Sequence, residues 1–193
     1  MGKIIKGATN STPNNLLLGP GAFFKGYDIT TDTPDTAMAK CIGATQGGGS
    51  FNAVPQIRKF EFDGVNPNTK GFADIDYWDV KMAANIGEVT LNSLKLALGA
   101  VTESVAAEPA GYKKLVGKDK IESSDYNDDL TWVGTLSGGN KPVIIVIKNA
   151  FSEKGLSLTF DGKKESVIPI ELTGNYTVDS DTPPFEIYYP SAS

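Results

Sequence analysis

The stretch that decides the fold is Val143-Ile144-Ile145-Val146-Ile147. Five consecutive β-branched residues favour a strand, and successive side chains of a strand point to opposite faces of a sheet. Both faces of this strand are therefore apolar, which indicates that both are buried. The turn residues Gly138-Gly139-Asn140 lie just before Pro142, so we expect residues 130–135 (LTWVGT) to pair with the run as a hairpin.

A second, longer hairpin is expected at residues 57–82. Residues 57–62 (IRKFEF) alternate in polarity, and strand-forming residues resume at Phe72 after a run of turn formers at 63–71. The apolar positions up to Tyr77 share one parity, whereas those from Trp78 onward share the other. This phase switch at Tyr77-Trp78 predicts a β-bulge, which bends a strand.

One helix is expected, over residues 90–98. Thr90 can cap its first turn, its leucines recur at spacings of three and four, and Gly99 can end it. A helix of this length is unstable alone, so it must lie on a sheet.

Further strands are expected at residues 156–160, 167–176 and 185–189, with Pro169 indicating a sheet edge. Residues 100–128 are polar and irregular, and are expected to form a long loop or insertion.

These signals predict a mainly β protein, a β-sandwich or barrel of about 7–8 strands flanked by one short α-helix, with a long hairpin loop and extended arms. The length of 193 residues suits one domain. Residues 1–50, rich in turn formers, are expected to be an N-terminal arm with edge strands. Residues 51–193 would then form the sandwich, including the helix and a C-terminal arm.

Composition excludes several classes of site. The chain has no histidine and one cysteine, so it has no Ser-His-Asp triad, no histidine metal ligand and no intrachain disulfide. We expect no cofactor and no metal. Residues 1–7 lack the apolar run of a secretory signal, and no segment of about 18 apolar residues occurs, so we expect synthesis in the cytoplasm and no membrane partner.

Other candidate sites have simpler interpretations. The acidic groups Asp74, Asp76 and Asp79, and Asp125, Asp128 and Asp129, complete neither a calcium loop nor a glycosidase pair, and are typical of solvated faces. The glycine-rich residues 43–50 lack the ending of a phosphate-binding loop and predict a flexible entry into a strand. Cys41, without a histidine to activate it, is expected to be structural.

The charge is distributed unevenly along the chain. Residues 1–60 hold six Lys and Arg against three Asp and Glu, whereas residues 61–193 hold twelve against twenty. A basic first part and an acidic remainder permit head-to-tail contact between copies. Together with open strand edges, which can pair with another chain, this favours a protein built for assembly.

Three stretches resemble the major tail tube proteins of tailed bacteriophages and related tube-forming particles. The first is LLLGPGAFFKGY at residues 16–27. The second comprises IGATQGG at 42–48, RKFEFDG at 58–64, the Lys70-Gly71 pair and LNSLKLAL at 91–98. The third comprises WVG at 132–134 and KPVIIVIKNA at 141–150. None is a catalytic signature, so the resemblance rests on order and spacing.

The resemblance implies a structural virion protein, not an enzyme, that forms hexameric rings stacked into a hollow tail tube. The hairpin loop would then reach the adjacent ring, through the residues Gly64, Val65, Asn66, Pro67, Asn68, Lys70 and Gly71. Partners would be copies of itself, a tape measure protein and a tail terminator. DNA would pass through transiently, and the net charge of −5 suits a wall that does not grip phosphates, so we expect a net negative lumen.

Two other classes remain open. A carbohydrate-binding β-sandwich of a phage baseplate or adhesion device would need an exposed aromatic platform, for which Trp78 and Trp132 are candidates, although both lie in strand patterns. A β-rich hydrolase would need a pair of carboxylates in a cleft.

Overall fold

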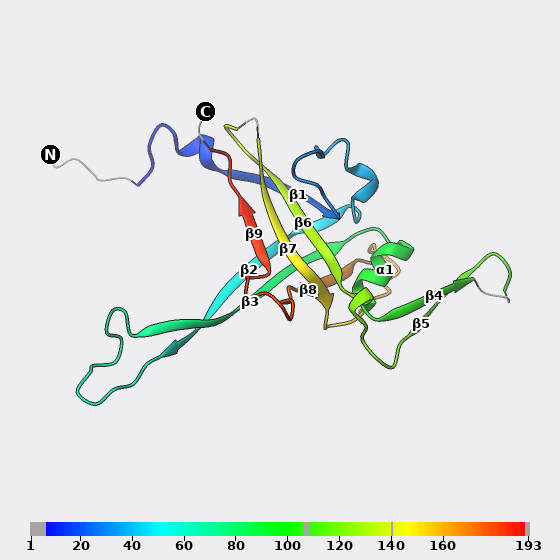
Figure 1. Ribbon diagram of the computed structural model, residues 1–193. Coiled ribbons are helices and arrows are strands. Elements are labelled where there is room, and N and C mark those ends of the chain that lie inside the picture. Colours follow the sequence, from blue (N-terminus) through cyan, green and yellow to red (C-terminus); the bar gives the residue numbers. More distant parts are fainter. Residues whose placement is uncertain (1–6, 106–108, 140, 192–193) are drawn as a thin grey trace.

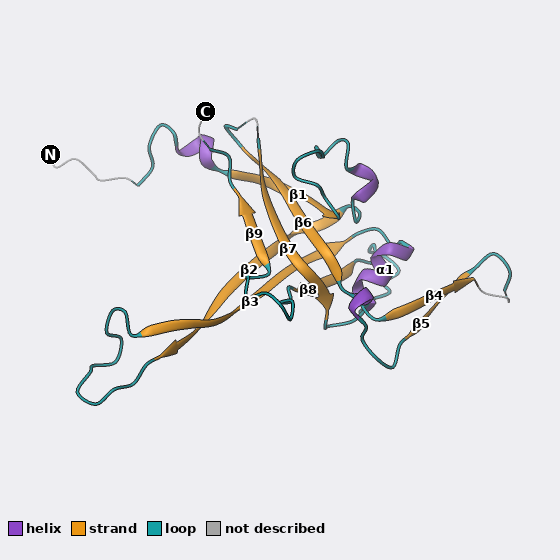
Figure 2. Ribbon diagram, in the orientation of Figure 1, coloured by secondary structure: helices purple, strands orange, loops and turns teal. Residues whose placement is uncertain are grey.

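The computed structural model describes residues 7–105, 109–139 and 141–191 and is mainly β (Figures 1 and 2). Over these residues the strands are β1 (Leu17–Lys25), β2 (Thr45–Lys59), β3 (Ala73–Ile86), β4 (Val101–Val105), β5 (Lys113–Gly117), β6 (Asn127–Leu136), β7 (Pro142–Ser152), β8 (Ile168–Thr173) and β9 (Phe185–Tyr188). The helices are α1 (Leu91–Leu98) and the short 3₁₀ turns η1 (Thr12–Asn15), η2 (Met38–Lys40) and η3 (Ser123–Asp125). Most of the segment considered for a secretory signal, and Asn140 of the expected turn, lie outside the described residues.

Strand β7 belongs to both of the main sheets. It pairs with β6 along most of its length, and on its other side residues 144–147 pair with β9. Strand β1 pairs with the far side of β6. The last residues of β7, Phe151 and Ser152, pair instead with β8, which continues to β3 and β2. All of these pairings are antiparallel, and the resulting layers are sandwich-like and not closed into a barrel.

Both faces of β7 are covered, as the apolar run predicts. Ile147 lies in the main core cluster between the layers, with side chains from β1, β3, β6, β8 and α1. Ile144 and Val146 face the other way and pack with Phe24, Tyr27 and Ala37, which belong to β1 and the segment that follows it. The N-terminal part of the chain therefore completes the body by covering the outer face of a sheet.

The expected helix is confirmed as α1. The Thr90 side chain accepts a hydrogen bond from the Ser93 N–H, the Ser93 side chain accepts one from the Thr90 N–H, and Gly99 ends the helix with φ 74°. Leu96 and Ala97 join the core cluster, and the Ser152 hydroxyl donates to the Ala97 carbonyl at 2.6 Å. The helix is thus held on the sheet by packing and by a buried hydrogen bond. None of the helices in the described residues is long and apolar enough to cross a membrane.

Two expectations about strands are wrong. Residues 100–128 contain the β4–β5 hairpin, which pairs Val101 with Gly117 and Val105 with Lys113. Most side chains of this hairpin are exposed, so its strands lack the regular apolar pattern by which a strand is predicted from sequence. Residues 156–160 form no strand. The side chains of Leu156 and Leu158 pack against the core, which accounts for the apolar pattern, but the backbone there pairs with no neighbouring strand in the described residues. The total is therefore nine strands in the described residues, instead of seven or eight.

The long hairpin is confirmed, with shifted boundaries. β2 begins at Thr45 and ends at Lys59, so the glycine-rich entry is part of the strand, whereas Phe60 and Phe62 lie in the loop. The expected bulge is present: Gln56 pairs with Tyr77 and Ile57 with Ile75, which leaves Asp76 unpaired between them. Beyond this point the hairpin projects away from the body, toward the lower left of Figure 1.

Pro169 also lies where a proline is tolerated. It pairs with Asn85 of β3, while the pairing of β8 with β7 involves only Leu172 and Thr173. The other side of β8 is therefore unpaired in the described residues at Pro169, which needs no N–H there.

Candidate assembly surface

The seven predicted loop residues lie together at the tip of the projecting hairpin. Gly64 and Gly71 adopt φ of 80° and 86°, and Asn68 adopts 66°, so the loop needs residues that tolerate left-handed backbone at these positions. The Thr69 hydroxyl donates to the Asn66 carbonyl at 2.6 Å, and Lys59 donates to the Asn68 side chain. The loop is thus locally ordered, and all seven residues except the half-buried Val65 are exposed.

Aromatic side chains form the base of this loop. The Phe60 N–H donates to the Phe72 carbonyl at 3.0 Å, which closes the loop. The rings of Phe62 and Phe72 meet edge to face, with centroids 5.9 Å apart. The Arg58 guanidinium lies 5.7 Å from the centre of the Phe60 ring and pairs with Asp76 at 3.1 Å. Phe62 nevertheless remains 60% exposed, so the tip presents apolar surface to its surroundings.

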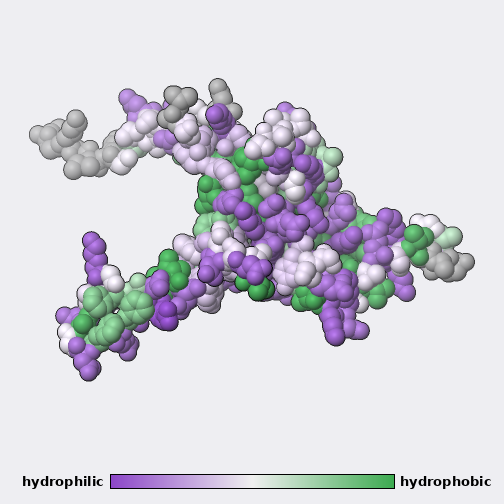
Figure 3. Space-filling model, viewed as in Figure 1, coloured by the Kyte–Doolittle hydropathy of each residue, from purple (hydrophilic) through white to green (hydrophobic). Residues whose placement is uncertain are grey.

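The shaft of the hairpin carries more apolar surface than the monomer uses. Ile57 and Ile75 face each other across the strands and are 58% and 48% exposed, and Tyr77 and Val54 are also exposed. Figure 3 shows apolar residues gathered along this projection, between charged ones. Exposed apolar side chains grouped in this way mark interaction surfaces.

The outer edge of β2 has no pairing strand among the described residues. On β3, the Trp78 N–H donates to the Tyr176 hydroxyl and the Val80 carbonyl accepts from Gly174, so both residues direct their backbone groups away from β2. Their partners Pro55 and Ala53 must therefore direct theirs to the free edge. Pro55 has no N–H, so it interrupts this edge for a pairing strand.

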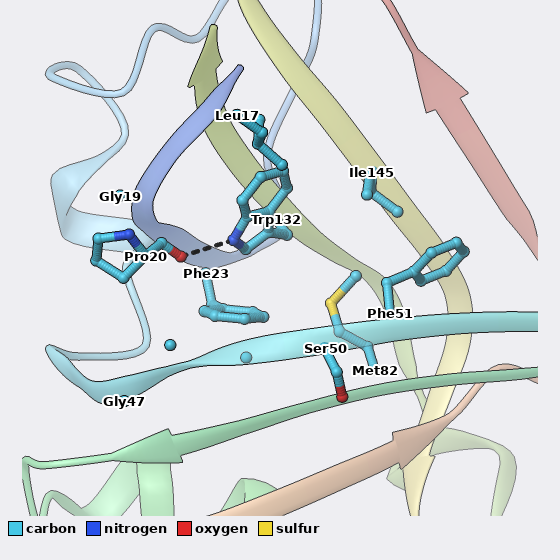
Figure 4. Close-up of a pocket in the computed structure, with 12 residues that line it drawn as sticks. Leu17, Gly19, Pro20, Phe23, Gly47, Ser50, Phe51, Met82, Trp132 and Ile145 are labelled. Carbon is cyan, nitrogen blue, oxygen red and sulfur yellow. Dashed lines mark hydrogen bonds between the residues drawn. The ribbon is translucent and has the colours of Figure 1, made fainter. Parts of the chain in front are cut away.

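A pocket of about 260 Å³ opens between β1 and the start of β2 (Figure 4). It is lined by Phe23, Phe51, Met82 and Trp132, and the Trp132 Nε1–H donates to the Pro20 carbonyl at 3.0 Å. The indole packs so closely on the chain that an added Cβ at Gly134 would come within 2.0 Å of it. Ser50 supplies the one hydroxyl among its described lining residues, and none of those residues is an acid, a base or a cysteine.

The two tryptophans do not form an exposed platform. Both Trp132 and Trp78 are half-buried against the main core cluster, and the Trp78 ring meets Phe185 with centroids 5.2 Å apart. Their expected place in the strand packing is confirmed, and so is that of Cys41, which is partly buried against the outer apolar cluster.

Three of the six acidic candidates form ion pairs in the described residues. Asp76 pairs with Arg58, Asp79 with Lys81, and Asp125 with Lys118 at 2.7 Å. Over the residues that the structure describes, no group of three or more Cys, Asp or Glu side chains is placed to hold a metal ion.

One acid is held in a less polar environment. Burial raises the pKa of Asp129 above its usual range, against the opposing effect of Lys148 across the ladder. The Lys148 ammonium donates to Glu186 on β9, and this hydrogen bond, with one from Tyr188, lowers the pKa of Glu186. The group links β6, β7 and β9, and so ties the C-terminal strand to the sheet.

The predicted loop residues lie at one hairpin tip, and their role in contacts between rings stays a prediction. Sequence reasoning missed the free edge of β2. Pro55 within a strand was the sequence signal for that edge. Which way Pro55 directs its backbone groups, however, depends on the register in which β2 pairs with β3.

Compared with known proteins, the sequence matches no family model, and no curated protein is a significant relative.

Proposed function

We propose that the chain is a structural virion protein that assembles with copies of itself into stacked hexameric rings, forming the hollow tail tube of a bacteriophage or of a related tail-like particle. The order of motifs along the sequence suggests this family. The observation that carries the proposal is the projecting β2–β3 hairpin, whose apolar shaft and tip are exposed in the single chain.

The hairpin has the properties of an element that is completed by a partner. A two-stranded ribbon outside a core is marginally stable in water. Burying a large apolar side chain contributes about 1.5–3 kcal/mol, so covering Ile57, Phe62 and Ile75 would favour association substantially. In the proposed tube, the loop 63–71 contacts the next ring.

The sheet edges supply the contacts within a ring. β2 has an unpaired margin in the described residues, and β1 and β9 form the two margins of the other sheet. Contacts between different margins of identical copies are heterologous, and they close into a ring when the rotation permits. Joined sheets would then line a continuous wall.

The charge suits passage of DNA. An acidic subunit, with a net charge of −5, has no overall excess of the Lys and Arg that neutralise phosphates. We propose that the lumen is net negative, and that a tape measure protein and a tail terminator are the other partners in the virion. A ring with mainly Lys and Arg on its inner wall would contradict this.

The test is self-assembly of the purified protein, followed by sedimentation velocity across a concentration series and by negative-stain microscopy. The expected result is rings and tubes. A chain that stays monomeric at every concentration would overturn the proposed function.

Deleting residues 64–70 tests the role of the loop. Phe60 and Phe72 are already paired, and the deletion leaves a four-residue connection, which a hairpin accommodates. The expected product is a folded protein that forms no stacks, with an unchanged circular dichroism spectrum. The matched control is Val105→Ser, which changes an 81% exposed apolar residue on the other hairpin and should leave tubes intact. Long tubes from the deletion variant would contradict the role of the loop.

A further inference from the structure

A second cleft lies on the side of the body away from the hairpin, among β1, η2, α1 and the segment after β5. It measures about 720 Å³. Five charged side chains line it: Lys25, Lys40, Lys95, Lys118 and Asp125. Lysines outnumber carboxylates in this lining by four to one, but Lys40, Lys95 and Lys118 each have a carboxylate partner. The positive charge left without an ion pair in the described residues is that of Lys25.

The lysines differ in how far they are neutralised. Lys118 pairs with Asp125 and Glu122 at 2.7 Å each. Lys95 pairs with Glu103 and Lys40 with Asp32, two carboxylates outside the cleft lining. Lys25 is exposed and makes no ion pair within the described residues. The cleft can therefore accept further carboxylates without losing the contacts that hold it together.

An exposed acidic turn lies between β8 and β9. Asp179 and Asp181 are both exposed and, in the part of the chain that the structure describes, neither makes an ion pair. Val178 at its tip is fully exposed. The other two acids of the last 23 residues, Glu171 and Glu186, are paired with Lys154 and Lys148.

The turn is firmly anchored to the body. The Asn175 amide donates to the Asn149 carbonyl at 2.9 Å, and the Asn149 amide donates to the Asn175 carbonyl at 3.0 Å. The Asn175 N–H also donates to the Lys148 carbonyl, and Ser180 closes the turn on Thr177. A carboxylate pair held in this way is pre-organised, which lowers the entropic cost of binding.

The cleft and the turn lie at opposite margins of one sheet. In the order β1, β6, β7, β9, Lys25 ends β1 at one margin, and the acidic turn leads into β9 at the other. In Figure 1 β9 lies to the left of β7 and α1 to the right. Two copies placed side by side in the same orientation would bring the turn of one toward the cleft of the other.

We propose that the lysine cleft receives the acidic turn, residues 177–182, of an adjacent copy of this chain. This inference rests on the proposed function, because it assigns the side-to-side contact within a ring. The contact is heterologous, as ring closure requires. Charge complementarity of this kind speeds and orients association, and it weakens as salt screens the charges.

The experiment combines two charge reversals. The turn variant carries Asp179→Lys with Asp181→Lys, and the cleft variant carries Lys25→Glu. Each should weaken association about tenfold or more in sedimentation velocity at low salt. Joined in one chain, the changes should recover part of the loss, because the reversed charges attract again. Losses that simply multiply would overturn the contact.

A matched control has the same change of charge on another exposed turn, Asp161→Lys with Glu165→Lys. It should associate as the unaltered protein does. An equal loss in this control would show that net charge alone acts, and would overturn the proposal. Circular dichroism of every variant checks that the fold is retained.

Cys41 provides a local readout, because it lines the cleft and is the only cysteine in the sequence. Its alkylation by iodoacetamide should slow severalfold when the protein assembles, and should stay fast in the turn variant. Tubes that form without protecting Cys41 would overturn the cleft contact and leave the proposed function standing. Protected oligomers that never stack into tubes would support the contact and contradict the tube.

Discussion

One β2–β3 ladder runs through two very different surroundings. In the body, Val80 and Ile86 of β3 are completely buried and Met82 is nearly so, whereas in the projecting half Ile75 and Tyr77 are about half exposed. The backbone pairing runs through both halves, with register shifts between Thr45 and Gly49 in the body and at the bulge beside Asp76. Pairing alone therefore does not indicate where the stability of this protein resides.

The difference shows what each half is suited to do. The inner half is stabilised by side chains from five other elements, so it holds the sandwich together. The outer half is held by local contacts, such as the Ile57–Ile75 pair and the Arg58–Asp76 ion pair, and exposed ion pairs contribute little. An element with apolar side chains and little core of its own is suited to being completed by a partner.

The largest expected effect comes from removing core volume. Leu172→Ala, at a fully buried position on β8, should lower the free energy of unfolding by about 2–5 kcal/mol, because it leaves a cavity between the layers. Urea denaturation followed by circular dichroism measures it. Ile57→Ala on the hairpin is the matched control, with an expected change of about 0.5 kcal/mol or less. Equal losses at the two positions would remove the distinction between body and hairpin.

Adding volume beside Trp132 should have the next largest effect. Gly134→Ala would place a Cβ within 2.0 Å of the indole, so the ring must move, at a cost of about 1–3 kcal/mol in unfolding free energy. Thermal unfolding and the tryptophan emission spectrum would both report the displacement. Gly162→Ala, where nothing lies within 4 Å of the added atom, is the control and should change neither.

A smaller effect of opposite sign is expected inside the body. The Thr131 hydroxyl is buried and has no hydrogen-bond partner among the described residues, so Thr131→Val should raise the free energy of unfolding by about 1 kcal/mol. Thr135→Val, on the same strand at an exposed position, should change it by less. A clear loss of stability in Thr131→Val would mean that this hydroxyl is satisfied.

The smallest effect on stability is expected on the hairpin, where assembly should change instead. Ile57→Ser with Ile75→Ser should leave the unfolding free energy within about 0.5 kcal/mol, because both side chains are largely exposed. Tube formation in negative-stain micrographs should nevertheless be lost. Retained tubes, or a much less stable monomer, would show that the shaft is not a contact surface.

Most of the body could be predicted from local sequence patterns. The apolar run 143–147 fixes a strand buried on both faces, and Thr90 and Gly99 fix the ends of α1. The phase switch near Tyr77 located the bulge to within a residue or two. These features are encoded by neighbouring residues, so they can be read without knowing the tertiary arrangement.

The features that depend on distant parts of the chain could not be predicted. The β4–β5 strands are short and exposed and lack a buried face, while Leu156 and Leu158 have an apolar pattern but no strand to pair with. For the candidate surface, turn residues placed the loop 63–71 at a tip. The basic cleft needed lysines from separate elements to converge, which no local pattern records.

Pro55 has a consequence for the lifetime of the unassembled chain. A fifteen-residue strand with an unpaired edge could pair with strands of other chains non-specifically, and cross-β fibrils grow by such pairing. Pro55 divides this edge into two shorter stretches, because it has no N–H to donate to an added strand. If the proposed assembly is correct, this interruption would protect newly made copies from fibril formation until they meet a neighbouring subunit.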